Sequence, residues 1–421
     1  MVVKLMAILL LETALFLITG HVVLANNSNW NHEPLEDTTN AVLKSIQSED
    51  GDIIDCVDIY KQPALNHPAL RNHKIQMLPS YVPTMEKTPR KINRAKRKKN
   101  KLYSKSESQV SVTKQIWHKN GSCPEGTVPI RRNMQTMNKA LPILSRRYNS
   151  SFNRSKHEFS QNNTLNMLRA NHAMSILLTE GYAYTGAQGD IAVYNPTVEG
   201  SDEYTLSDVS LENGGQGFFE AIRSGWMVNP MVYGDKNTRF FTYWTADGAK
   251  STGCFDSLCP GFVQVSKDIA LGATIDHISS PSNRPSQVMS ISIYKDQNTN
   301  NWWVDLGGKK IGYWPSELFE GLSHHAASVQ WGGDVYSTRL TTPHTATAMG
   351  SGEYASPIDW LVGSIRGMRI LQYSSGWKYP EWTNTYADQY DCYSFYLQIV
   401  ADDPVFYYGG PGSGGPVSRC H

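Results

Sequence analysis

The chain has 421 residues, with 39 Lys and Arg against 38 Asp and Glu, and a formal net charge of +1. A nearly neutral chain is not a general binder of polyanions, and this length is enough for one large domain or two ordinary ones. The 22 Tyr, 12 Phe, 11 Trp and 33 Gly favour β-structure connected by many turns.

Residues 1–25 have the pattern of a secretory signal peptide. Lys4 precedes a mostly apolar stretch from Leu5 to Val23, and Val23-Leu24-Ala25 forms a small-residue cleavage pattern at its end. An N-terminal membrane anchor is the alternative, but the positive charge and the small-residue exit favour cleavage. No other stretch approaches the roughly 18 apolar residues that a spanning helix needs. We therefore expect a secreted, extracellular protein without a stable membrane anchor.

Secretion determines how the six cysteines are interpreted. An even number in an oxidising compartment implies three disulfides. We predict the pairs Cys254–Cys259, Cys392–Cys420 and Cys56–Cys123. The first closes a short loop flanked by glycines, the second ties the glycine-rich tail to the last strand-like run, and the third follows by elimination. A zinc site is the alternative, but the C-x4-C spacing has no matching second pair, so no metal is expected.

Five N-x-S/T sequons, which are glycosylation signals in secreted proteins, begin before residue 165. Their asparagines are Asn26, Asn120, Asn149, Asn153 and Asn162. This clustering indicates that the region is largely exposed loop.

Residues 48–85 have the composition of a small module that precedes the main domain. Several prolines exclude a long helix, and the apolar residues are too many for a disordered linker. We expect this segment to pack on the larger domain and to cover its groove.

Residues 86–110 form a basic linker, with ten Lys or Arg and no acid between Lys87 and Lys105. Nucleic-acid binding is one interpretation, but aromatic residues are not interleaved apart from Tyr103. A solvated linker with a processing site at Arg94-Ala95-Lys96-Arg97 is the interpretation that we favour, and no nucleic-acid partner is expected.

Residues 165–421 consist of short alternating runs separated by Gly, Asn, Asp and Pro, as in "ASVQWGGDVYS" and "YSFYLQIV". This pattern predicts an all-β fold, an antiparallel β-sandwich of two large sheets. "KDQNTNN" reads as a hairpin loop, and residues 157–174 are the only modest helix candidate. No H-E-x-x-H, G-x-S-x-G or P-loop motif occurs, and His344, in a polar run, is expected to be structural rather than a base.

Several blocks of the sequence resemble the plant neprosin family in the family's order. They cover most of the chain from about Ser48 onward and comprise "DGDIIDCVDIYKQPALNHPALRNHKIQM", "WHKNGSCPEGTVPIRR", "IRSGWMVNP", "RFFTYWTADGAKSTGCFDSLCPGFVQV", "NWWV", "GYWPSELF", "VQWGGDVY" and "YYGGPG". The resemblance implies a secreted glutamic peptidase that cleaves after proline, is made as a zymogen with an activation peptide, and needs no cofactor. It also implies two catalytic glutamates facing each other across a cleft.

This sequence departs from the family pattern at both catalytic positions, which carry Arg223 and Asp334. A two-carboxylate hydrolase needs one ionised and one protonated acid, and two close carboxylates supply both states. Aspartate shortens the arm by one methylene, and a guanidinium is neither a base nor a proton donor. Strand parity points Glu220 away from Arg223, whereas Glu353 lies after a Gly-Ser-Gly loop that leaves its reach open.

Two functions follow, and the sequence leaves open whether any activity survives. The first is a pseudo-peptidase that binds a proline-containing peptide, a protein or wall material without cutting it. The second is an active proline-directed glutamic or aspartic-type endopeptidase made as a zymogen, with Glu353 as a possible substitute acid. In the first case we expect Arg223 and Asp334 to face a groove and form an ion pair.

Overall fold

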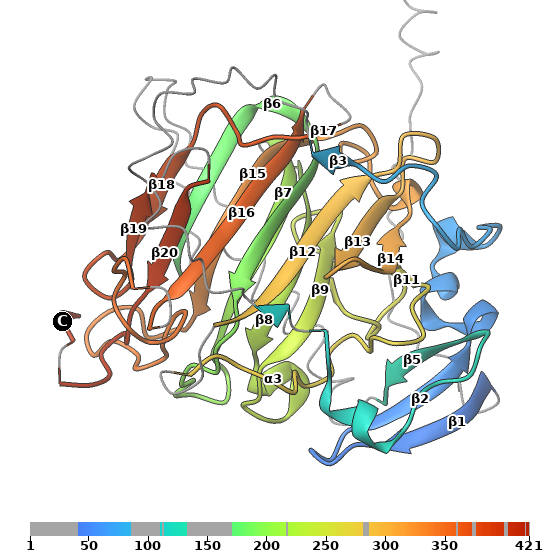
Figure 1. The fold of residues 1–421 in the computed structure, drawn as a ribbon, viewed down its shortest axis with the longest axis horizontal. Helices are drawn as coiled ribbons and strands as arrows, with labels where there is room; N and C mark the ends of the chain where they lie inside the picture. The colour runs from blue at the N-terminus through green and yellow to red at the C-terminus, as the bar shows by residue number, and fades with distance from the viewer. Residues whose placement is uncertain are drawn as a thin grey trace, which may run out of the picture. The chain divides into compact units, whose positions relative to one another are not determined.

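The structure of the protein, a computed structural model, consists mainly of β-strands (Figure 1). The described residues contain one α-helix, α3 (Pro230–Tyr233), and several short 3-10 turns. None of the helices in the described residues is long and apolar enough to cross a membrane. The described ranges are 41–85, 110–111, 113–132, 171–215, 218–280, 286–358, 361–372, 376–399, 403–416 and 418–420.

The strands fall into a small N-terminal group and a large C-terminal group. The N-terminal strands are β1 (Val42–Gln47), β2 (Ile53–Asp58), β3 (Thr84–Met85), β4 (Val110–Ser111) and β5 (Thr127–Arg131). The C-terminal strands are β6 (His172–Ala192), β7 (Tyr204–Gly215), β8 (Phe218–Val228), β9 (Arg239–Thr245), β10 (Cys254–Phe255), β11 (Val263–Gln264), β12 (Gln287–Lys295), β13 (Trp302–Leu306), β14 (Lys309–Trp314), β15 (Ala326–Tyr336), β16 (Gly363–Gln372), β17 (Gly376–Trp377), β18 (Asn384–Ala387), β19 (Ser394–Gln398) and β20 (Val405–Gly409). The 3-10 turns are η2 (Ile59–Lys61), η3 (Pro63–Asn66), η4 (Pro68–Leu70), η6 (Ile116–Asn120) and η8 (Ser316–Leu318).

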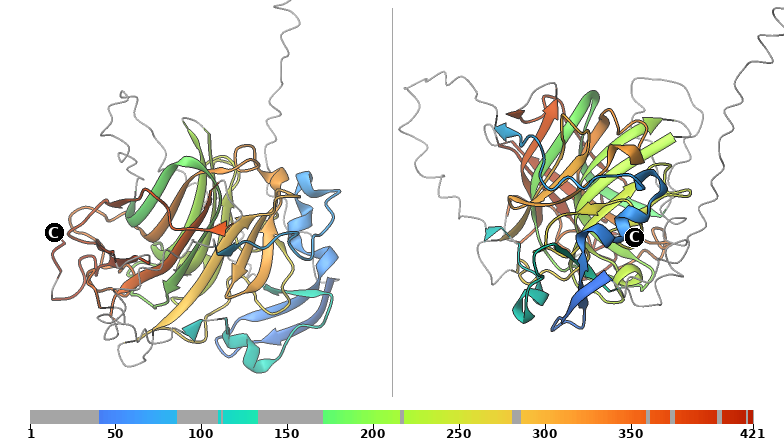
Figure 2. Two further views of the ribbon diagram at one scale, coloured as in Figure 1. Left: turned by 45° about the horizontal axis from the view of Figure 1, so that its top comes forward. Right: turned by 90° about the vertical axis from the view of Figure 1, so that its right-hand side faces the viewer.

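Strand β6 belongs to both layers of the large sheet. Its first half pairs with β15 on one edge and β18 on the other, whereas its second half pairs with β12 and β16. One layer therefore continues from β15 through β7, β8 and β9 to β10, and the other through β12, β13 and β14 to β11 and through β16 and β20 to β19 (Figures 1 and 2). The fold is all-β, with a large curled sheet that is antiparallel apart from a short parallel bridge, as predicted.

Large aromatic side chains fill the space between the layers. In β15, alternate residues Val329, Trp331 and Val335 face a single large apolar cluster, which also contains Ile222 and Trp226 of β8. This alternation is the one that half-buried strands require. Further fully buried tryptophans come from the β13–β14 hairpin. Arg223 of β8 and Asp334 of β15 therefore lie on the opposite faces of these strands.

A small three-stranded sheet, β1-β2-β5, forms an N-terminal module. Cys56 of β2 is joined to Cys123, which lies shortly before β5, and their Cα atoms are 5.4 Å apart. The module therefore unites residues before and after the basic linker. Its core consists of Ile46, Ile54 and Trp117 with the disulfide, packed against Ala270 and Ala273 of the large domain.

The N-terminal module packs on the domain, but its described contacts do not go to the predicted catalytic positions. Ala64 and Leu70 join the main apolar cluster beside β11 and β14, and Gln62 exchanges hydrogen bonds with the backbone of Gln264. Asp52 forms an ion pair with Arg239 of β9, at 2.6 Å. These contacts therefore place the module on the domain but do not support the expectation that it covers a groove at Arg223 and Asp334.

All three predicted disulfides are present, including Cys254–Cys259 and Cys392–Cys420. The hairpin loop predicted at "KDQNTNN" connects β12 to β13. The helix candidate 157–174 was wrong where it can be compared, because His172 begins strand β6, while most of it lies outside the described residues. The signal peptide, residues 86–109 of the basic linker and four of the five sequons also lie outside them, and the domain boundaries remain predictions.

Candidate functional site

Arg223 and Asp334 lie on the same face of one layer, on strands that flank β7. In the register of the sheet, Arg223 of β8 pairs with Ser210 of β7, and Asp334 of β15 pairs with Leu206. Asp208 is midway between those two β7 residues. Since residues two apart on a strand share a face, Asp208 lies diagonally between Arg223 and Asp334.

These side chains form one ionic cluster that also includes His172. The Nε of Arg223 donates to Oδ2 of Asp208 at 2.5 Å, and its Nη1 is 3.6 Å from Oδ2 of Asp334. The other oxygen of Asp334 lies 2.8 Å from Nδ1 of His172, at the start of β6. The predicted ion pair between Arg223 and Asp334 is present, but it is the longer of the two pairs that Arg223 makes.

Two glycines on either side of Asp208 make room for this cluster. Gly225 of β8 and Gly332 of β15 both pair with Asp208 and lack side chains on the shared face. A Cβ at Gly225 would lie 2.0 Å from the carbonyl oxygen of Ser207, and one at Gly332 would lie 2.2 Å from that of Ser175. Larger residues therefore do not fit at either position without a backbone shift.

The cluster is buried, which corrects the expectation that Arg223 and Asp334 look into a groove. Arg223 is 3% exposed and Asp334 is 1% exposed. On one side, apolar residues of α3 and of the 249–258 loop pack against Leu206 and Met227, and on the other Met174 pairs with Asp334. In this state of the chain, neither position is presented to a substrate.

Burial and charge act on Arg223 in opposite directions. Burial lowers the pKa of the Arg223 guanidinium, whereas Asp334 and Tyr243 oppose this shift, and the net direction is downward. A guanidinium nonetheless stays protonated at any relevant pH. An opposite charge at these distances favours the ionised form of both Asp208 and Asp334.

His172 and Arg223 hold the Asp334 carboxylate in its ionised form, so neither Asp334 nor Arg223 can donate a proton to a leaving group. An ionised carboxylate only accepts hydrogen bonds, so the Nδ1 of His172 carries the hydrogen of the bond to Asp334. Asp334 is thus engaged by an imidazole and a guanidinium at once. A general base needs an accessible lone pair, and a general acid needs a proton that it can release, and Arg223 supplies neither.

The two other acids considered from the sequence do not join the cluster. Glu220 is buried on the opposite face of β8, where its carboxylate accepts hydrogen bonds from the backbone N–H groups of Glu320 and Leu322 at 2.6 Å. Glu353 is exposed, and its loop packs through Met349 against Gly333, on the face of β15 opposite to Asp334. Recruitment of Glu353 as a substitute acid therefore has no support in this geometry.

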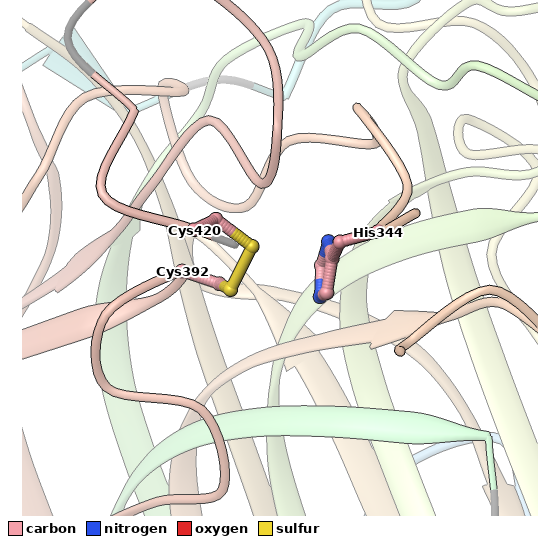
Figure 3. A group of neighbouring side chains, drawn as sticks. All are labelled: His344, Cys392 and Cys420. Atoms are coloured by element: carbon pink, nitrogen blue, oxygen red, sulfur yellow. A yellow bond between two sulfur atoms is a disulfide. The ribbon is translucent and has the colours of Figure 1, made fainter. Parts of the chain in front are cut away.

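His344 lies beside the Cys392–Cys420 disulfide, as Figure 3 shows. Both sulfur atoms are committed to the bridge, so they are not thiolate ligands for a metal. The ring nitrogens of His344 contact the Thr345 carbonyl at 2.8 Å and the Gln389 side chain at 2.6 Å. These contacts give His344 the structural role expected of it.

Comparison with known families matches two successive segments of the chain. Residues 45–178 match the neprosin activation peptide, and residues 201–411 match the neprosin domain. The chain belongs to the neprosin family. It thus carries a peptidase-like neprosin domain that is preceded by an activation peptide.

Solved structures with a weaker similarity include two peptidases. Scytalido-glutamic peptidase with a peptide-based transition-state analog is 10% identical, with 57% of this chain and 98% of that chain covered and a TM-score of 0.30. SCP-B, a member of the Eqolisin family of peptidases in complex with the tripeptide Ala-Ile-His, is 9% identical over the same shares, with a TM-score of 0.27.

Sequence reasoning missed two members of the cluster, Asp208 and His172. Alternation in "TLSDVSL" places Asp208 on the face opposite to Val209 and Leu211, which was a usable signal. Its position between Arg223 and Asp334 depends on strand register, which the sequence does not give. His172 was missed because it was assigned to a helix candidate. Asn120, the one described sequon, is exposed, and its glycosylation remains a prediction.

Proposed function

We propose that this chain is a secreted, glycosylated pseudo-peptidase of the neprosin family that binds a proline-containing peptide, protein or wall material without cutting it. The observation that carries the proposal is Arg223, buried between Asp208 and Asp334. A permanent cation replaces the shared proton that a two-carboxylate hydrolase requires. Asp334 then acts as a charge partner of Arg223 rather than as a catalytic acid or base.

A second candidate function is an active proline-directed endopeptidase of aspartic type. The observation that favours it is that Asp208 and Asp334 both contact Arg223, so two carboxylates lie close together. For this enzyme to work, Arg223 would have to leave the cluster so that the two acids could share one proton. Asp208 then takes the role that the sequence had offered to Glu353.

The test is turnover of a proline-containing fluorogenic peptide at acid pH, measured on the full-length protein before and after removal of the activation segment. The wild type should be inert. Changing Arg223→Glu and Asp334→Glu together with Asp208→Asn should restore at least weak cleavage after proline, because it supplies two glutamates and removes the extra carboxylate. The matched control is Glu353→Gln in the same background, which should leave the restored activity unchanged.

Activity in the wild type would decide between the two functions. Turnover that Asp208→Asn and Asp334→Asn each abolish would establish the aspartic-type enzyme and overturn the pseudo-peptidase. Turnover that survives both Asp334→Ala and Asp208→Ala would show that neither carboxylate performs the chemistry.

A further inference from the structure

Residues 73–85 form an extended segment on the large domain, and hydrogen bonds from several of its residues attach it there. The backbone N–H of Gln76 donates to the hydroxyl of Tyr313 at 2.8 Å, and the ring of His73 contacts the same hydroxyl at 2.8 Å. Further along, Thr84 and Met85 pair with β17. The segment is therefore held at separate points along its length.

Two side chains of this segment are bound by the loop between β12 and β13. The Gln76 amide donates to Asp296 at 2.9 Å and accepts from Thr299 and Asn301, also at 2.9 Å. Four residues later, the backbone N–H and the hydroxyl of Ser80 both donate to Asp296, at 2.5 and 2.6 Å. Donor and acceptor groups of both residues are thus matched, which is the pattern of specific peptide recognition.

Two apolar side chains anchor this segment, since Ile75 packs against the main apolar cluster and Pro83 is buried, but three others are exposed. Met77, Leu78 and Val82 are 51%, 69% and 49% exposed. Asp296, which binds Gln76 and Ser80, is fully buried. A segment that belonged permanently to the core would bury such side chains, because apolar burial is the main source of folding stability. Between Gln76 and Ser80, the loop thus binds polar groups of the extended chain and leaves the side chains of Met77 and Leu78 largely to solvent.

We propose that the surface formed by Asp296, Thr299, Asn301 and Tyr313 is a binding site for an extended peptide with a carboxamide side chain and, four residues later, a hydroxyl side chain. In the unprocessed protein, residues 76–80 fill this exosite. It is separate from the buried Arg223 cluster. The exosite becomes vacant only if residues 76–80 leave it, and cleavage in the basic linker alone does not release them, because the Cys56–Cys123 disulfide retains this part of the chain. The recognition of the peptide itself does not depend on that release.

The test uses the full-length protein and a fluorescein-labelled peptide of residues 73–85, with binding followed by fluorescence anisotropy. The wild-type chain fills its own exosite and should bind the peptide weakly. The double variant Gln76→Ala with Ser80→Ala loosens the chain's own segment and should bind about tenfold or more tightly, because hydrogen bonds to a carboxylate are lost in the competing segment. Intact disulfides and an unchanged unfolding midpoint confirm that this variant is folded.

The labelled peptide provides matched controls that cannot unfold the protein. A peptide with the same two alanine changes should bind about tenfold or more weakly, whereas Leu78→Ala should bind like the original because Leu78 faces solvent. Hydrogen bonds from Ser80 and Gln76 lower the pKa of Asp296 against the opposing effect of its burial. Binding should therefore weaken as the pH falls below the ordinary aspartate value of 3.8.

Three results would each overturn the exosite: equal affinity of the two proteins for the peptide, equal affinity of the variant for the original and doubly changed peptides, or no binding at all. Failure of the pseudo-peptidase proposal would be seen separately, as turnover of proline substrates by the wild type, and it leaves the exosite measurement unaffected.

Discussion

At the scale of single residues, Arg223 determines whether two nearby aspartates can share a proton. Its guanidinium lies between Asp208 and Asp334, so both carboxylates are compensated in the ionised form. The cluster is buried, which makes its charges mutually dependent, because an uncompensated charge in a dry environment is costly. The same contacts that oppose catalysis therefore stabilise the fold.

Replacing Arg223 by methionine should destabilise the protein strongly. Two buried carboxylates would lose their cation, which we expect to cost about 3–5 kcal/mol at neutral pH. The triple variant Arg223→Met, Asp208→Asn, Asp334→Asn should recover most of this loss. Urea unfolding provides the measurement, with Arg132→Met as a control that should cost about 1 kcal/mol or less, since Arg132 is half exposed in its pair with Asp55. Unchanged stability of the Arg223 variant would contradict the cluster.

Asp256 should make stability depend on pH. Burial raises the pKa of this carboxyl to about 7, although hydrogen bonds from the Thr242 N–H and the Tyr233 hydroxyl act against the shift. In the unfolded chain the group ionises near 3.8, so the fold keeps a proton that the unfolded state loses. The contribution of Asp256 to stability is then largest at acid pH and falls as the pH rises from about 4 to about 7.

The change Asp256→Asn removes this titration. Between pH 4 and pH 7, the wild type should lose up to about 4 kcal/mol of unfolding free energy relative to the variant, from about three pH units. Unfolding of both proteins at the two pH values provides the comparison, and groups common to both cancel. Parallel pH profiles would show that Asp256 ionises normally in the fold.

The residues of the site were only partly predictable. Family blocks and strand parity identified Arg223 and Asp334 and placed them on faces opposite to Trp226 and Trp331, and the structure brings them together. Their burial was not predicted, because it depends on α3 and the 249–258 loop, which are remote in sequence from Asp334. Parity assigns a side chain to a face of a strand but does not determine what covers that face.

At the scale of elements, the N-terminal module is defined by a disulfide within the activation segment. The Cys56–Cys123 disulfide joins segments on either side of residues 86–110, and β2 pairs with β5. The sequence predicted the bond correctly, but not that β5 completes the module's sheet. Pairing partners that are distant in the chain are set by packing, and composition does not reveal them.

Cleavage in the basic linker should therefore not release residues 41–85. After limited digestion between residues 86 and 110 by a trypsin-like protease, the two fragments should migrate as one species on a non-reducing denaturing gel. Reduction should separate them. Immediate separation without reductant would show that the Cys56–Cys123 bond is not formed in the purified protein.

At the scale of the whole molecule, the proposed loss of catalysis has a consequence for maturation. A pseudo-peptidase does not remove its own activation segment, so purified full-length protein incubated at acid pH should keep its mass. Addition of an exogenous protease should be required to shorten it. Mass spectrometry over time provides the measurement, and unaided shortening of a pure sample would contradict the proposal.

The all-β class was predictable because strand alternation is local, whereas the sharing of β6 between layers was not.

The double membership of β6 sets an order in which the protein can be built. This strand emerges early from the ribosome, at residues 172–192, but two of its four partners, β16 and β18, begin only at Gly363 and Asn384. Until those residues have been synthesised, β6 lacks one neighbour in each layer, and its open edges can pair wrongly with other chains. The disulfide-linked module of residues 41–132 depends on no such late partner for its own sheet and can form first. Truncation after β15 would thus leave both layers incomplete, and folding of the large sheet requires the strands up to β18.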